Sequence, residues 1–523
     1  MTLNFYYDNT TENPASGGTY IEGVMGQPTF INPLIAQINE IDRDLIEVLF
    51  SNLFDLTENY KTDSDNKIWT VSLKKNLKWD DGHDLTADDV VFTIKTIQEL
   101  ENNTPDFSFW SEVAIQKIND HELVFELKGY LNSFLDNLKT LKITPKHIFG
   151  NIPPMNLKLS QYNLEPVGSG PYKFVRLATE KNGFISQIHL TANPLYHDKK
   201  AFMSNLVFKF YIDESELIKD FNLKKISGFG GIDPKNIEEL KINHKIYNLN
   251  LPRYYAIFFN NANQKVLQEK EVGRALNLAT NRKELIQKIF NGYAAISDGP
   301  IPASLNSYDK KIYEDDLFSP EEARKLLERA GWLINPEDNV RYKTTKKNRE
   351  KLEFDMIVPQ IPFLMEAADL IKKDWSKLGV MLNIIIVNIN DINKELIKTR
   401  NYQMLLFGNM LSGNADIFSF WHSSERFYPG LNLSLYNNKE VDRILEEIRK
   451  NYDQQKIKGA LVKIQQIIHE DIPAVFLFNP NYIYTTTDDL HGFNLSNLNS
   501  QSNRFEKINH WHLKIKRRFA KNT

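Results

Sequence analysis

The 523-residue sequence contains no cysteine. Disulfide bonds, thiolate nucleophiles, iron–sulfur clusters and the common structural zinc sites are therefore excluded. Long apolar runs are also missing. Two of the longest, "MLNIIIV" at 381–387 and "PAVFLF" at 473–478, fall far short of the roughly 20 residues that a membrane-spanning helix needs. We therefore expect a chain that does not cross a membrane.

An excess of positive charge is absent too. Lys and Arg together number 64 against 67 for Asp and Glu, which gives a net charge of −3. Such a chain has no basic field to hold a polyphosphate backbone, so nucleic acid is not an expected partner. Hydrophobic residues make up 41% and aromatic residues 12% of the sequence. This composition predicts a large core divided among two or three domains.

Signatures of catalysis are missing when they are sought directly. The sequence has no GxxxxGK[ST] phosphate loop, no GxSxG elbow and no HExxH zinc helix. The Gly-rich stretches 168–172 and 227–231 lack the strand, GxGxxG and helix order of a dinucleotide fold, and we predict turns there. None of the eleven histidines has a second histidine at helical i, i+4 spacing. We expect no catalytic residue, no cofactor and no metal.

The stretch "WDDGHDLTADDV" from residue 79 concentrates carboxylates around His83. A metal site is one interpretation, but neighbouring ligands in a turn seldom converge on one point. The pattern fits the start of a helix better, because Thr86 and Asp89 have capping-box spacing before an apolar helical face. Asp81 and Gly82 fit a turn just before it. We therefore predict a helix that begins at Thr86 and runs to residue 100.

Hydrophobic periodicity places further elements along the chain. Helices are expected at 41–54, 214–222, 282–291, 320–330 and 459–471. Strands are expected at 19–24, 67–73, 122–127 and 254–259. Ser319 before Pro320 and Gly331 after the helix are strong start and stop signals. We interpret the cationic tail "KIKRRFAK" as a solvated end.

Several segments together carry a resemblance to a known family. "WTVSLKKNLKWDDGHDLTADDVVFTI" closely resembles the signature segment of the family 5 extracellular solute-binding proteins, the oligopeptide- and dipeptide-binding components of ABC importers. Other segments follow in the family's order, among them "VGSGPYKF", "YYAIFFNN", "VGRALNLATNRKELIQKIFNGYAAISDGPIP", "EARKLLERAGW", "DIFSFWHSSE" and "HEDIPAVFLFNPNYIY". The resemblance covers nearly the whole chain.

The resemblance implies an α/β, two-lobed periplasmic-binding-protein fold of class II type with an additional α+β domain. Its scheme places a polar tether at 1–18, lobe I at 19–53, 166–254 and 481–523, the additional domain at 54–165, and lobe II at 255–480. A peptide or similar solute would be captured between hinged lobes and delivered to permease subunits. The hinge would lie near 254–260 and 476–484.

Ligand recognition is where the sequence departs from the family. Peptide-binding members place an acid soon after a Gly-Trp pair to hold the peptide ammonium. Here Asn409 replaces the Trp, Ser412 stands where the acid is expected, and Asp416 is the nearest acid. The resemblance nominates the following ligand contacts: Asn39, Phe107, Phe109, Trp110, Asn409, Met410, Asp416, Trp421, His422 and Phe478. For 107–110 and for the loop around His422, ordinary packing is the competing interpretation.

The resemblance also implies an exported monomer, extracytoplasmic and anchored by a lipid on a cysteine ahead of residue 2. Sugars and metal chelates remain alternative ligands, because related members bind them. Two other functions stay open: a peptide chaperone or scaffold that uses the same cleft, and a hydrolase, which the missing motifs disfavour.

Overall fold

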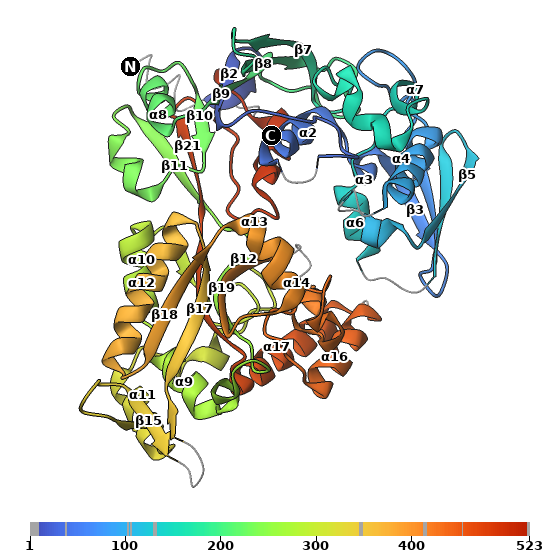
Figure 1. Cartoon of the computed structure of the whole chain (residues 1–523). Coiled ribbons are helices and arrows are strands. Elements are labelled where there is room, and N and C mark those ends of the chain that lie inside the picture. The colour runs from blue at the N-terminus through green and yellow to red at the C-terminus, as the bar shows by residue number, and fades with distance from the viewer. Residues whose placement is uncertain are drawn as a thin grey trace. The chain divides into compact units, whose positions relative to one another are not determined.

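The structure is a computed structural model that describes residues 10–36, 39–101, 104, 107–128, 133–344, 349–411, 416–451 and 453–519 (Figure 1). The chain forms two compact units. Unit 1 comprises Met1–Leu249 and Tyr482–Thr523, and unit 2 comprises Asn250–Asn481. The chain therefore passes between the units twice, after residue 249 and after residue 481.

Unit 1 is built on a seven-stranded sheet in the order β11-β21-β10-β2-β9-β8-β7. Its strands are β2 (Thr19–Met25), β7 (Tyr172–Thr179), β8 (Ile185–Ala192), β9 (Asn205–Tyr211), β10 (Gly228–Gly230), β11 (His244–Leu249) and β21 (Tyr482–Thr487). Strand β2 is parallel to β9 and β10, and the remaining pairs are antiparallel. Helix α8 (Glu214–Asn222), which was predicted at this position, precedes β10.

Strand β10 corrects the turn that was predicted at 227–231. Its glycines lie under aromatic hydroxyl groups: a Cβ at Gly228 would come 2.1 Å from the Tyr20 hydroxyl, and one at Gly230 would come 1.9 Å from that of Tyr482. The glycines are therefore required by close packing inside the sheet and do not mark a chain reversal.

Helix α2 (Glu40–Leu49) ends earlier than predicted, and α3 (Leu53–Leu56) follows as a separate turn. The break occurs because the loop at 168–170 occupies the end of α2. The Gly170 amide donates to the Leu49 carbonyl at 2.8 Å, and a Cβ at Gly168 would lie 2.0 Å from that carbonyl oxygen.

A second sheet of unit 1 has the order β3-β4-β6-β5. Its strands are β3 (Thr57–Thr62), β4 (Ile68–Leu73), β5 (Val113–Asn119) and β6 (Glu122–Leu127), and the accompanying helices are α4 (Ala87–Leu100), α5 (Phe107–Trp110), α6 (Phe134–Thr140) and α7 (Lys146–Phe149). The predicted capping box of α4 is confirmed: the Thr86 amide donates to the Asp89 carboxylate at 2.9 Å. The predicted strands at 67–73 and 122–127 are confirmed as β4 and β6.

The two ends of the described chain form a small sheet of their own. Strand β1 (Thr10–Ala15) pairs antiparallel with β22 (Lys514–Phe519). Part of the predicted tether and of the predicted solvated tail is therefore ordered as β-structure. Both were missed because each strand takes its hydrogen bonds from the opposite end of the sequence.

Unit 1 also contains a fully buried charge cluster. The Arg504 guanidinium donates to the Asp44 carboxylate at 2.6 and 2.8 Å and to Glu22 at 3.1 Å. The Tyr484 hydroxyl donates to the other Glu22 oxygen at 2.9 Å and lies 2.8 Å from the Tyr20 hydroxyl. Two carboxylates thus share one guanidinium out of contact with water.

Unit 2 contains a six-stranded sheet in the order β13-β20-β12-β19-β17-β18. The strands are β12 (Arg253–Phe259), β13 (Ala294–Ile296), β17 (Glu353–Pro359), β18 (Met381–Val387), β19 (Met404–Met410) and β20 (Ala474–Pro480). Strand β12 sends Ile257 and Phe259 into one apolar core and Ala256 and Phe258 into another. Both faces of the sheet are therefore buried, as helices on either side require.

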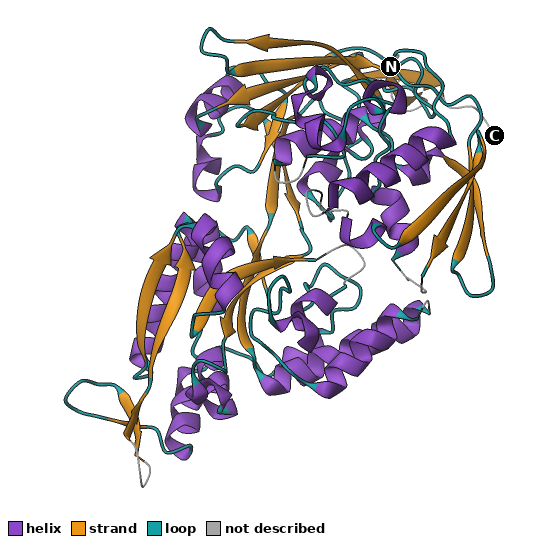
Figure 2. Cartoon of the chain, turned by 45° about the vertical axis from the view of Figure 1, so that its right-hand side comes forward, coloured by secondary structure: helices purple, strands orange, loops and turns teal. Residues whose placement is uncertain are grey.

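One core of unit 2 is covered by α9 (Lys270–Leu278), α10 (Arg282–Phe290), α11 (Pro320–Arg329) and α12 (Pro362–Lys377). The other is covered by α15 (Phe418–Trp421), α16 (Lys439–Arg449) and α17 (Gln454–Asp471) (Figure 2). Short elements complete the unit: α13 (Ile389–Asp391), α14 (Ile397–Thr399), β14 (Leu333–Ile334), β15 (Arg341–Thr344) and β16 (Arg349–Lys351). Within the described residues, no helix combines the length and apolar character that crossing a bilayer demands.

Candidate ligand-binding residues

A buried hydroxyl joins two of the predicted contact residues in unit 2. The Asn409 side-chain amide on β19 donates to the Tyr254 hydroxyl at 2.9 Å, and the Trp421 indole N–H donates to the same oxygen at 3.2 Å. Burial raises the pKa of Tyr254 well above its usual range. The hydroxyl therefore stays neutral and fixes the end of β19 against helix α15.

Replacing this hydroxyl is expected to destabilise unit 2. Tyr254→Phe leaves the Asn409 and Trp421 donors buried without their acceptor, which costs about 2 kcal/mol of unfolding free energy. Chemical denaturation measures the loss. Tyr428→Phe is the matched control, because that ring is 59% exposed in the same unit, and it should change stability by less than about 0.5 kcal/mol. Equal effects of the two substitutions would contradict this role of Tyr254.

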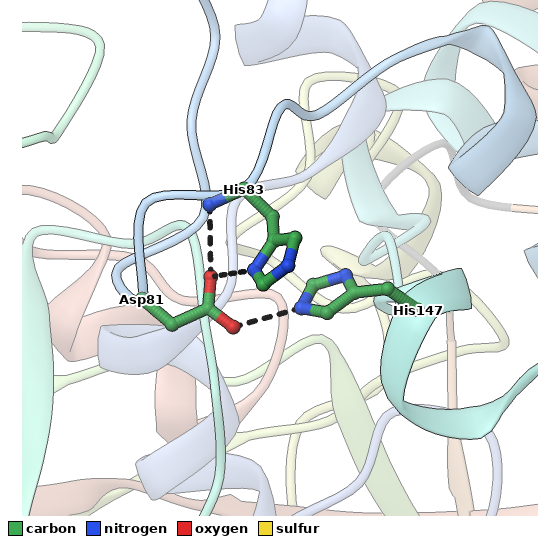
Figure 3. A group of neighbouring side chains, drawn as sticks. All are labelled: Asp81, His83 and His147. Atoms are coloured by element: carbon green, nitrogen blue, oxygen red, sulfur yellow. Dashed lines mark hydrogen bonds and ion pairs between the residues drawn. The ribbon is translucent and has the colours of Figure 1, made fainter.

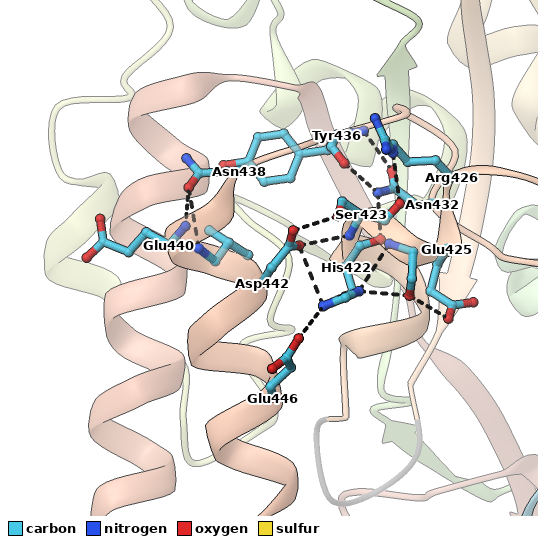
Figure 4. A network of polar contacts seen from close by, with 12 residues as sticks. His422, Ser423, Glu425, Arg426, Asn432, Tyr436, Asn438, Glu440, Asp442 and Glu446 are labelled. Carbon is cyan, nitrogen blue, oxygen red and sulfur yellow. Dashed lines mark hydrogen bonds and ion pairs between the residues drawn. The ribbon is translucent and has the colours of Figure 1, made fainter.

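His422 is a buried imidazole with one nitrogen left open. Its Nδ1 accepts from the Ser424 backbone amide at 3.1 Å and lies 2.8 Å from the Ser424 hydroxyl. Its Nε2 is 3.5 Å from a Glu446 oxygen and 3.9 Å from an Asp442 oxygen (Figure 4). Among the described residues, that nitrogen has no hydrogen-bond partner. Because Nδ1 accepts a hydrogen bond, the ring carries a proton on Nε2, which faces two carboxylates.

Asp416 is already paired with a cation. Its carboxylate lies 2.9 Å from an Arg449 nitrogen, and the Arg449 guanidinium stacks 3.7 Å from the centroid of the Phe418 ring. The same ring stacks on His422, with centroids 4.1 Å apart. A ligand ammonium at Asp416 would have to share this carboxylate with Arg449 or displace it.

The remaining predicted contacts in unit 2 differ in exposure. Met410 is 47% exposed, whereas Phe478 and Trp421 are fully buried. Phe478 packs among aromatic rings of its own unit, such as Phe290 at 5.0 Å. Direct ligand contact by the two buried residues remains a prediction, and in this structure both serve the core.

In unit 1 the predicted contacts likewise divide into buried side chains and partly exposed ones. Asn39 caps helix α2: its oxygen accepts from the Ile41 amide at 3.0 Å, and its nitrogen donates to Gln27 and Thr29, each at 3.1 Å. Trp110 is 1% exposed and packs against Phe125 and Phe134. These contacts agree with the interpretation of Trp110 as a core residue. Phe107 and Phe109 are half-buried. Ser412 lies outside the described residues.

Sequence reasoning did not nominate Tyr254, Asp442, Glu446 or Arg449. The last three recur at helical spacing along α16, so one face of that helix turns toward the segment 416–422, which contains α15. That spacing is a usable signal. Tyr254, in contrast, sits inside an apolar strand pattern and is revealed only by its partners.

Comparison with known proteins places this arrangement in a family. Residues 54–427 match the family described as bacterial extracellular solute-binding proteins, family 5. The match covers more than half of the chain, which therefore belongs to this family of substrate-binding proteins of ABC importers.

Individual relatives extend the match along the chain. The sequence is 27% identical to the oligopeptide-binding protein AppA of Bacillus subtilis (strain 168) over 499 residues, which are 92% of this chain and 89% of that protein. The solved structure of AppA in complex with a nonapeptide has a TM-score of 0.73 at 26% identity and covers 96% of this chain and 100% of that one. NikZ from Campylobacter jejuni, solved in complex with Ni(L-His), shares the fold with a TM-score of 0.73 at 24% identity, covering 94% of this chain and 99% of that one.

Proposed function

We propose that the protein captures oligopeptides outside the cytoplasm and hands them to the permease of an ABC importer. The observation that carries this proposal is the collinear match to an oligopeptide-binding protein over 92% of the chain. The relative was solved with a nonapeptide, a ligand that needs contacts along its backbone as well as at its ends.

Hinge motion is proposed at the two chain crossings. On the unit 2 side, the Arg253 guanidinium donates to the Pro480 carbonyl at 2.8 Å, and the Asn479 amide donates to the Leu251 carbonyl at 2.8 Å. These bonds tie the two crossing segments to each other, so both would bend together. Occupancy of the ligand site then shifts the population of the closed form.

Further parts of the proposal concern organisation and location. Residues 54–165 would form the additional α+β domain, and lobes I and II would correspond to the rest of unit 1 and to unit 2. The protein would act as a lipid-anchored, extracytoplasmic monomer that carries out no chemistry on its ligand.

Asp416 is the residue proposed to receive the peptide ammonium. Asp416→Asn removes the negative charge and is expected to weaken binding of a free-amine nonapeptide at least tenfold, since a charge-assisted hydrogen bond contributes about 1.5–3 kcal/mol. Isothermal titration calorimetry measures the affinity.

The matched control for this prediction changes the ligand. A nonapeptide with an acetylated N-terminus lacks the charge, so it should bind the wild type and Asp416→Asn with similar affinity. If acetylation leaves wild-type affinity unchanged, Asp416 does not hold the ammonium, although peptide binding itself could still stand.

The proposed function is tested by native mass spectrometry of the purified protein. Peptides of mixed sequence and similar length, released intact on denaturation, would support it. A single bound non-peptide solute, or cleavage of an added peptide, would contradict it.

A further inference from the structure

His147 joins the acidic turn that precedes helix α4. Asp81 and His83 lie in the turn, and His147 comes from helix α7, far along the sequence (Figure 3). One Asp81 oxygen is 3.1 Å from His83 Nδ1, and the other is 2.8 Å from His147 Nε2. One donor atom from each residue lies within 4.8 Å of the others.

The capping box of α4 positions this group. Asp89 uses one carboxylate oxygen for the Thr86 amide and the other for the Lys146 amide, at 2.9 Å in both cases. The second bond fixes the start of α7, so His147 is held over the turn. Local sequence could not show this convergence, because the third side chain arrives from another element.

The turn itself is also braced. The Gly82 amide donates to the Trp79 carbonyl at 3.0 Å, with Gly82 at φ +97°, and the His83 amide donates to the Asp81 carboxylate at 3.1 Å. The two imidazole rings stack with centroids 4.2 Å apart. The donor atoms are thus close together, and rotation of the stacked rings would aim both nitrogen lone pairs at one ion.

We propose that Asp81, His83 and His147 form a binding site for a divalent first-row transition metal ion. Two imidazoles and a carboxylate suit Cu²⁺ and Ni²⁺. The imidazole nitrogens lie 3.1 and 2.8 Å from the two different oxygens of Asp81, so both are within reach of one carboxylate.

All three side chains of the proposed site are accessible to solvent. The His83 side chain is 63% exposed, while those of Asp81 and His147 are 27% and 23% exposed. An ion can therefore enter on the His83 side, where water would fill its remaining positions. The bound ion would clamp the turn to α7, because it would replace the hydrogen bond between Asp81 and His147 that now joins them.

The test is titration of tag-free full-length protein with Cu²⁺. Calorimetry should show a tightest site of one ion per chain, and the electron paramagnetic resonance spectrum of that complex should report two nitrogen donors. His147→Ala should weaken the site at least tenfold and remove one nitrogen from the spectrum. Asp81→Asn should weaken it without changing the nitrogen count.

His121→Ala is the matched control, since His121 is an exposed histidine in the β5–β6 turn of the same domain, and it should leave the site intact. A tightest site that keeps its affinity and its two nitrogen donors in His147→Ala would overturn the assignment. Peptide affinity measured on the same variants should be unchanged, so this result is independent of the proposed function.

Discussion

At about pH 8, above the raised pKa of Glu22, Arg504→Met is expected to lower the free energy of unfolding by about 3–5 kcal/mol, because it leaves two buried carboxylates without their shared cation. The side chains of Arg504 and Glu22 are 2% and 0% exposed, and that of Asp44 is 6% exposed. Removing the cation lowers the free energy of unfolding by more than the ion pairs themselves contribute, because the remaining carboxylates stay buried without a partner. Denaturant unfolding followed by tryptophan fluorescence measures the change.

Two further variants separate the charge effect from lost packing. Arg43→Met removes a neighbouring arginine of helix α2 whose pair with Glu40 is 38% and 40% exposed, and it should cost less than about 1 kcal/mol. The triple variant Glu22→Gln/Asp44→Asn/Arg504→Met has no buried charge and should regain most of the lost stability. A loss below 1 kcal/mol for Arg504→Met alone would contradict the argument.

Stability is expected to fall as pH rises from about 4.5 to about 7, in part because of Glu22. Burial raises the pKa of Glu22 from 4.5 to about 7, against the opposing effect of Arg504. Between these values the unfolded chain has released this proton and the native protein has kept it. The native state then binds more protons, so the free energy of unfolding decreases with pH. At about 1.4 kcal/mol for each pH unit, this group contributes roughly 3 kcal/mol.

Glu22→Gln isolates this contribution. The amide resembles the protonated acid and cannot ionise, so the difference in unfolding free energy between pH 5 and pH 7.5 should shrink by roughly 2.4 kcal/mol relative to wild type. Other titrating groups act equally in both proteins and cancel. The same pH dependence in wild type and variant would show that Glu22 is ionised throughout this range.

Local signals in the sequence were sufficient for several elements. Helix α11 was predicted because its start and stop residues act within a few positions: Ser319 caps the Glu322 amide, and Gly331 takes φ +87°. Helix α4 was predicted for the same reason. The seven-stranded sheet was harder, since β10 is recognisable only from the strands on either side of it.

In the candidate site, too, single residues could be predicted from the sequence, whereas their contacts with distant residues could not. Asn409 and Trp421 could be nominated by resemblance, but they meet at Tyr254, which is 155 and 167 residues away from them in the sequence. The pairing of Asp416 with Arg449 is likewise a contact between separate elements. Pairwise chemistry of this kind depends on tertiary packing, which no local pattern encodes.

The order in which strands enter the large sheet of unit 1 sets an order of folding. Within the described sheet β11 touches β21 alone, and β21 also borders β10. Until residues 482–487 have been synthesised, β11 has no partner strand in this sheet, and Arg504, which donates to Glu22, is synthesised later still. Unit 2 is one uninterrupted segment, so its internal contacts can form without any residue that follows it in the sequence. The earliest part of the chain to emerge therefore completes its fold last.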